Sequence, residues 1–157
     1  MQNLAFMQKQ FEILRANRIQ ILKIIEPLSI NQINKIPEGH RNSIAWNMAH
    51  LVVTHQLLCY KHSGLNILVT EEMVEKYQKG TVPQNEMTLE ELDYVKEQLL
   101  ALVDTFEEDY KANIFREYQA YPTSAKVILN DITDAFQFNN FHEGIHLGVI
   151  LSLKKQV

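Results

Sequence analysis

The sequence has few of the residues that interrupt helices and almost none of the residue that forms covalent cross-links. Its 157 residues include five glycines, four prolines and a single cysteine, Cys59. One cysteine excludes an intrachain disulfide and a cysteine-rich zinc site. Scarce glycine and proline, placed between periodic segments, favour helices separated by loops. A chain without disulfides suits the reducing cytoplasm, where we expect this protein to be located.

An excess of positive charge is also missing, as is a long apolar run. The formal net charge is −4 at pH 7, whereas nucleic-acid-binding domains usually carry a basic patch. Lysine and arginine are scattered, which argues against a polybasic membrane anchor. The apolar runs are shorter than the ~20 residues that span a bilayer. The N-terminus shows no signal-peptide pattern. We therefore expect no nucleic-acid partner and no membrane partner.

The residues that are present predict one helical domain. Hydrophobic residues make up 46% of the sequence, enough to bury a core, and we expect residues 1–157 to form a single domain. Apolar residues at three- and four-residue spacing predict long amphipathic helices. Their approximate ranges are 3–25, 43–62, 88–110 and 130–154.

Capping residues mark where several helices begin. Thr88 and Glu91 predict a capping box at the third long helix, and Asn130 is the expected N-cap of the fourth. Thr70 predicts a short helix within the long connection that precedes Thr88. Strand signals are weak, and no convincing sheet is expected. The predicted fold is all-α, a four-helix up-down bundle with a long crossover connection between the second and third long helices.

Two histidines share one face of the fourth predicted helix. His142 and His146 are four residues apart, so their side chains project from the same side, one turn apart. That side carries the apolar stripe and should point into the bundle. Two imidazoles at this spacing can bind one metal ion. The alternative is a pair of core histidines that bond to backbone carbonyls or water.

The same segment matches the zinc-protease pattern H-E-x-x-H letter for letter. Those proteases need a third ligand downstream, but no Asp, Glu or His follows His146. A third ligand must therefore come from earlier in the chain. The candidate is His50, on the inward side of the second predicted helix. Three imidazoles leave coordination positions open for water or substrate, and they suit zinc, nickel, cobalt and iron alike.

The other three histidines fit a shared metal site less well. His40 lies in a polar loop and is expected to be exposed. His55 projects well over a quarter-turn away from His50 on the same helix. His62 lies at the end of that helix, near solvent. The predicted metal ligands are therefore His50, His142 and His146.

Two segments resemble motifs of the DinB-like superfamily, the DinB and bacillithiol-transferase type of metal-binding four-helix bundle. Residues 43–51, Ser-Ile-Ala-Trp-Asn-Met-Ala-His-Leu, resemble its second-helix motif. Residues 142–148, His-Glu-Gly-Ile-His-Leu-Gly, resemble its last-helix motif. The resemblance covers nearly the whole chain. It implies a three-histidine site for zinc or nickel, formed here by His50, His142 and His146, and often a homodimer.

The resemblance also suggests what the site does. Characterised relatives include S-transferases that use low-molecular-weight thiols such as bacillithiol and mycothiol, and related isomerases. The leading hypothesis is a metal-dependent transferase or hydrolase that acts on a small-molecule substrate, with a low-molecular-weight thiol as one candidate. The ion would lower the pKa of a bound water or thiol. The alternatives are a non-catalytic metal-binding, small-molecule-binding or stress protein, and a structural bundle without metal.

No catalytic residue is assigned. Glu143 is either a general base beside the metal or a solvated glutamate off the apolar stripe. Asn47 and Asn139 lie one turn from ligands and either orient them or are ordinary polar positions. Cys59 is expected to be a small core or interface residue. The second predicted helix is apolar almost all round, which hints at a subunit interface.

Overall fold

The computed structural model describes residues 4–157, and most of them are helical. The long helices are α1 (Leu4–Ile25), α3 (Ile44–His55), α5 (Leu89–Lys111) and α6 (Ile132–Lys154), and the short ones are α2 (Ile30–Asn34) and α4 (Glu71–Tyr77). A π-helical turn, η1 (Gln56–Tyr60), and a 3-10 turn, η2 (Lys61–Ser63), prolong α3. The predicted all-α class is confirmed.

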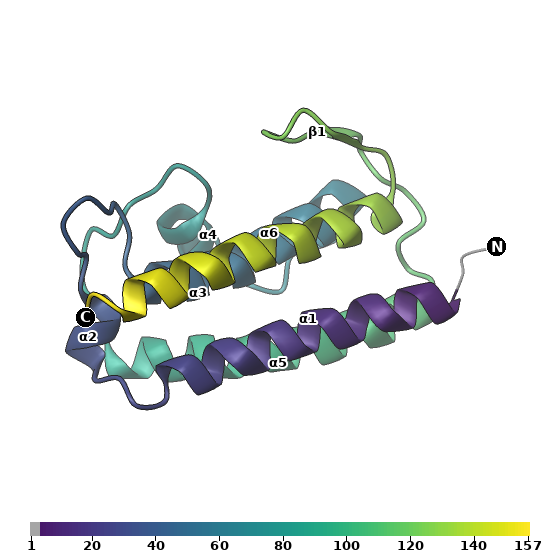
Figure 1. Ribbon diagram of the computed structural model, residues 1–157. Coiled ribbons are helices and arrows are strands. Elements are labelled where there is room, and N and C mark those ends of the chain that lie inside the picture. The colour runs from purple at the N-terminus through teal and green to yellow at the C-terminus, as the bar shows by residue number, and fades with distance from the viewer. Residues whose placement is uncertain (1–3) are drawn as a thin grey trace.

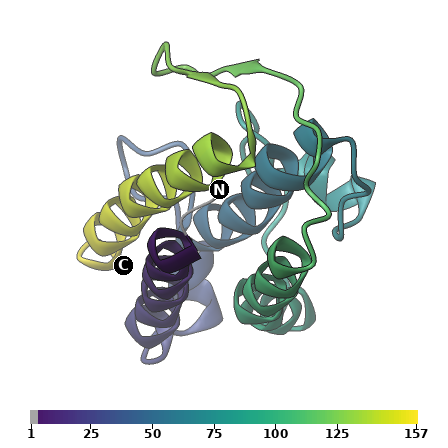
Figure 2. The same cartoon turned by 90° about the vertical axis from the view of Figure 1, so that its right-hand side faces the viewer.

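The long helices pack in two layers, with α3 and α6 in one and α1 and α5 in the other (Figure 1). Each long helix contacts one neighbour in its own layer and one in the other layer, through the pairs α1–α6, α3–α6, α1–α5 and α3–α5. Helices α1 and α6 run in one direction, and α3 and α5 run in the opposite one. The view along the helices shows that the segment before α6 passes over the outer side of the α3–α6 layer, while α4 lies beside α3 (Figure 2).

Helix α3 is the most deeply buried element. Each of its residues is buried except Thr54, because α2, α4, α5 and α6 all pack against it. Its all-round apolar character is therefore accounted for inside one chain and no longer argues for a subunit interface. Among the described residues, no helix is long and apolar enough to cross a membrane.

The predicted helix starts are confirmed at two positions and wrong at one. Thr88 and Glu91 form the capping box of α5, and the Thr70 hydroxyl accepts the N–H of Met73 at the start of α4. The N-cap of α6 is Asp131, not Asn130, because the Asp131 carboxylate accepts the N–H of Asp134 at 2.8 Å. Two adjacent residues of good capping type competed for one position.

A small hairpin departs from the sequence-based expectation of no sheet. Strands β1 (Tyr121–Pro122) and β2 (Ile128–Leu129) pair antiparallel, with Tyr121 opposite Leu129. Thr123 closes the hairpin, since its N–H and its hydroxyl both donate to the carbonyl of Val127. A side-chain hydroxyl that completes a turn leaves no alternating apolar pattern, so periodicity could not reveal the pair.

Candidate metal centre

Three imidazoles meet on the outer side of the α3–α6 layer. His50 comes from α3, and His142 and His146 come from α6. One ring nitrogen from each lies within 4.8 Å of the others, and Nε2 of His50 is 3.3 Å from Nε2 of His142. A tetrahedral ion with metal–nitrogen bonds of about 2.0–2.1 Å would hold two imidazole nitrogens about 3.3 Å apart. The group could therefore hold a metal ion.

Hydrogen bonds fix two of the three rings. Nδ1–H of His50 donates to the carbonyl of Tyr77 at 2.7 Å. The amide nitrogen of Asn47 donates to the carbonyl of Ser43 at 2.8 Å, so its Oδ1 faces His146 and accepts from Nδ1–H at 2.7 Å. Both histidines are thus held as Nδ1–H tautomers, with the Nε2 lone pair available to an ion.

His142 is the ring whose hydrogen-bonding capacity is least used. Its Nδ1 is buried without a hydrogen-bond partner among residues 4–157, and its Nε2 faces the imidazole of His50. Buried polar atoms are normally paired. The alternative of core histidines satisfied by backbone carbonyls is therefore a poor description of this ring, whereas a ligand role for Nε2 accounts for its position.

Burial keeps all three imidazoles neutral near pH 7. It is the main cause that lowers the pKa of His50, against a smaller raising effect of the Tyr77 carbonyl. Burial, with the neighbouring His146 and His50, lowers the pKa of His142 to about 3. Burial and His50 lower the pKa of His146 to about 4. Neutral imidazole is the form that binds a metal.

Trp46 of α3 packs against the metal site and is itself held by the residues at and after the end of α4. The indole of Trp46 stacks on the His50 ring, with centroids 4.4 Å apart and planes at 13°. Its Nε1–H donates to the Thr81 hydroxyl at 3.0 Å, and that hydroxyl lies 2.8 Å from the carbonyls of Lys76 and Gln78. Sequence reasoning gave Trp46 no role and missed Tyr77, which acts through its backbone carbonyl and so has no side-chain signal.

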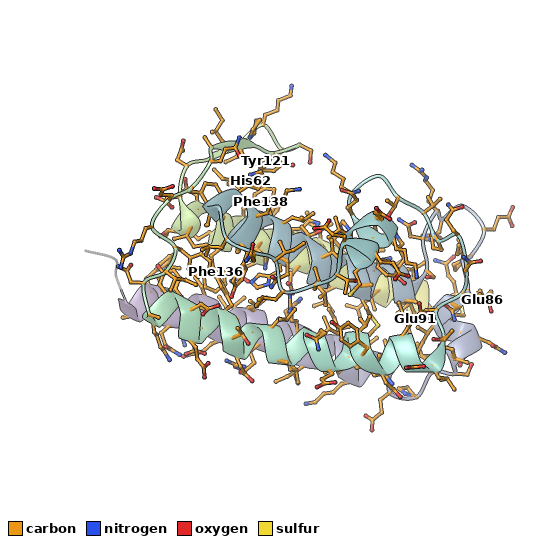
Figure 3. The ribbon with its side chains drawn as sticks, turned by 180° about the vertical axis from the view of Figure 1, so that it is seen from behind. His62, Glu86, Glu91, Tyr121, Phe136 and Phe138 are labelled. Atoms are coloured by element: carbon orange, nitrogen blue, oxygen red, sulfur yellow. The ribbon has the colours of Figure 1, made fainter. Side chains whose placement is uncertain are left out.

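A pocket of about 860 Å³ opens above the histidines. It extends from the end of α4 to the β1–β2 hairpin, and all three rings belong to its wall. At the hairpin end, His62, Tyr121 and Phe138 gather where the hairpin passes over α3 and α6 (Figure 3). The histidines are therefore reachable from solvent by a molecule of moderate size.

Glu143 is neither a general base beside the metal site nor a solvated glutamate, the two roles that the sequence left open. It is 1% exposed, and its Oε1 accepts from Nη2 of the fully buried Arg18 at 2.6 Å. Asn17 and Asn139 also donate to it, each at 3.3 Å. Nη1 of Arg18 donates to the carbonyl of Leu99. The Glu143 carboxylate therefore pairs with α1, away from the pocket, and Asn139 contacts it rather than a ligand.

The remaining histidines stay outside the cluster, as the sequence suggested. His55 is fully buried and meets Phe106 edge-on, with centroids 4.7 Å apart. The His62 ring lies against Tyr121, with centroids 4.6 Å apart. His40 lies at the pocket edge, 3.1 Å from the amide of Gln156. Cys59 is a buried core residue, and burial raises the pKa of its thiol.

The fold and the cluster define a class, an all-α protein with three convergent imidazoles at the bottom of an open pocket. The chain belongs to the DinB superfamily, whose family model matches residues 13–150. The matched range contains all three histidines. A comparison with curated proteins finds no match. The resemblance read from the two motifs is therefore confirmed.

Proposed function

We propose that this protein is a metal-dependent enzyme that binds one divalent ion through His50, His142 and His146 and acts on a small molecule in the adjoining pocket. The observation that carries the proposal is the convergence of three neutral imidazoles, two of them fixed as the metal-binding tautomer, at the bottom of an open pocket. Zinc and nickel are the proposed ions, on the resemblance to the family.

The pocket favours an S-transferase over a hydrolase. A divalent ion with an open coordination position lowers the pKa of a bound thiol or water. No aspartate or glutamate is among the described residues of the pocket wall, and Glu143 is engaged with Arg18. A thiol, with a pKa of about 8.5, loses its proton far more readily than water. In S-transfer its sulfur bonds to an electrophilic carbon, and the leaving group departs with the electron pair.

The chain's own residues would orient the partners. The Tyr77 carbonyl and the Asn47 side chain accept from Nδ1–H of His50 and of His146, which leaves the Nε2 atoms of both rings for the ion. The hydroxyl of Thr54, also in the pocket wall, lies 3.3 Å from Nε2 of His50, where it can donate to a nucleophile bound beside that ring. The missing carboxylate base equally fits a second candidate, a non-catalytic metal-binding, small-molecule-binding or stress protein.

The proposed architecture is a four-helix up-down bundle of α1, α3, α5 and α6, with the long crossover between α3 and α5. Support comes from their pairwise contacts and from the parallel course of α3 and α5, which requires a long connection. We also propose a cytoplasmic homodimer. For a chain of 18.3 kDa, light scattering after size exclusion distinguishes a dimer from a monomer.

Metal analysis of the purified protein tests the proposal. One zinc or nickel per chain is expected, and His146→Ala should lose it, whereas His62→Ala, which removes a pocket histidine outside the cluster, should retain it. Protein that binds no divalent ion on reconstitution, with stability indifferent to chelator, would refute the metal site. If metal binds but no thiol is consumed in a screen of thiols and electrophiles, the non-catalytic candidate replaces the enzyme.

A further inference from the structure

The pocket carries a charge opposite to that of the chain. The sequence has 19 acidic and 15 basic residues, yet the described residues of the pocket wall include Arg41, Lys61 and Lys79 and no carboxylate. All three cations are exposed. None of them takes part in the ion pairs found among residues 4–157. The pocket therefore presents unpaired positive charge to whatever enters it.

The two ends of the pocket differ in chemistry. Arg41 comes just before α3, and Lys79 lies two residues before Thr81, whose hydroxyl accepts from Trp46 in the first turn of α3, so both lie at the end of the pocket where α3 begins. The other end lies under the β1–β2 hairpin, where Phe138 of α6 and Tyr121 of β1 lie close together (Figure 3). The Phe141 ring, 5.7 Å from that of Phe138, extends this aromatic wall. Lys61 also lies at this hairpin end, since it follows η1. The pocket is thus amphipathic along its length.

The histidines lie between these ends. His50 is on α3 between Arg41 and the hairpin end, and its Nδ1–H reaches the carbonyl of Tyr77, two positions before Lys79. His142 lies next to Phe141 on α6. A ligand with a charged group near Arg41 and an apolar body beside Phe141 would therefore place its middle over the imidazoles.

We infer that the pocket binds an elongated organic anion, with its carboxylate or phosphate between Arg41 and Lys79 and its apolar body against Phe138 and Phe141. A guanidinium matches the two oxygens of either anion, and aromatic rings bury apolar surface efficiently. The inference rests on the proposed function in that it names its substrate class. The positive charge of Arg41 and Lys79 is present whether or not a metal ion is bound. Three neutral ligands would leave the charge of a divalent ion uncompensated, which favours an anion further.

The sequence contains one tryptophan, Trp46, which is in the pocket wall against His50 and so reports ligand binding by fluorescence. The probes are 3-phenylpropanoate, 2-phenylethyl phosphate and the neutral 3-phenylpropanamide. At least one anion should bind about fivefold more tightly than the amide, an effect expected of one or two exposed ion pairs. The stronger of the two anions identifies the preferred head group. Added salt should reduce the preference.

Charge-neutral variants locate the anion. Arg41→Gln combined with Lys79→Gln should bring the affinity for the anion down to that for the amide, while amide binding stays unchanged. Lys61→Gln is the matched control, because it removes a pocket cation at the hairpin end, and it should keep the preference. Equal affinities for anion and amide in the unmodified protein overturn the inference. So does a preference that survives the double substitution or disappears in Lys61→Gln.

Titrations of the chelated protein and the zinc-loaded protein separate this inference from the proposed function. An anion preference in protein that binds no metal leaves the inference intact and refutes the metal site. Stoichiometric metal binding without any anion preference supports the metal site and overturns the inference. A preference that appears only with zinc and ignores Arg41 and Lys79 also overturns the inference, because the ion alone would then select the anion.

Discussion

At the residue scale, the site depends on the hydrogen-bond acceptors that orient two of the histidine rings, so that the Nε2 of each points toward the place of the ion. Asn47→Ala removes the acceptor of Nδ1–H of His146 and should weaken metal affinity about 10- to 100-fold, the usual effect of losing a group that orients a ligand. Competition with a chromogenic chelator measures it. Asn139→Ala is the control, a buried amide on α6 that donates to Glu143 and not to a ligand. Equal losses of affinity in both variants would remove the positioning role of Asn47.

The pair of Arg18 and Glu143 leads to a second residue-scale prediction. Both side chains are buried, at 0% and 1% exposure, so Glu143→Gln leaves a buried guanidinium unpaired and should cost about 3–5 kcal/mol of unfolding free energy. Denaturant unfolding of chelated protein measures the loss. The combined Arg18→Met and Glu143→Leu variant should recover much of it, because no isolated charge then remains. A Glu143→Gln variant of full stability would contradict the prediction.

The contrast between these residues shows what a sequence reveals. The four-residue spacing and the apolar stripe suffice to bring His142 and His146 together, and elimination of the other histidines leaves His50. The partner of Glu143 lies 125 positions away on α1, and no local pattern encodes that distance. Arg18 interrupts the stripe of α1 visibly, but an interruption alone does not name the acid that compensates it.

At the element scale, α4 is the helix that joins the site to the rest of the fold. Its last residue supplies the Tyr77 carbonyl to His50, and Trp46 is tied to Thr81 just beyond it. Sequence patterns predicted α4 from its N-cap, but they could not place it against α3, because packing of a short helix on a long one depends on the whole connection. The same holds for the β1–β2 hairpin, whose turn relies on one threonine.

Two matched N-cap substitutions test the role of α4. Thr70→Ala removes the N-cap of α4 and Thr88→Ala that of α5, and each should cost about 0.5–2 kcal/mol of unfolding free energy. Only Thr70→Ala should also weaken metal affinity and shift the fluorescence of Trp46, because α4 contacts the site and the start of α5 does not. Isothermal titration with zinc measures the affinity. An equal effect of both variants on zinc binding would show that α4 has no special part in it.

At the scale of the whole molecule, both layers of helices contribute to the core between them, and the site lies on the outer side of the α3–α6 layer. Aromatic rings of α1, α5 and α6 pack between the layers, as in the contacts of Phe11 with Phe106 and Phe136. The outer side of the α3–α6 layer instead carries the three imidazoles, which are partly exposed to the pocket. Burial keeps these three histidines neutral in the folded protein. The unfolding free energy is therefore lower wherever the unfolded chain can protonate them.

This difference in protonation predicts how the stability of the metal-free protein depends on pH. Histidines of the unfolded chain have a pKa of about 6.5, whereas burial lowers the pKa of His142 to about 3 and of His146 to about 4. Between these values the unfolded chain binds more protons than the folded one, so unfolding free energy must fall as pH falls. His50 and His55, whose pKa values burial also lowers, add to the slope.

Urea unfolding in chelator between pH 7 and pH 5 measures this slope above the range in which carboxylates titrate. His142→Gln combined with His146→Gln should flatten it, because two of the groups that take up protons on unfolding are gone. Saturating zinc should raise the unfolding free energy throughout this range and leave the slope almost unchanged, because the folded imidazoles bind no protons there with or without the ion. A stability that stays constant from pH 7 to pH 5, or an unchanged slope in the double variant, would mean that the imidazoles are not held neutral by burial.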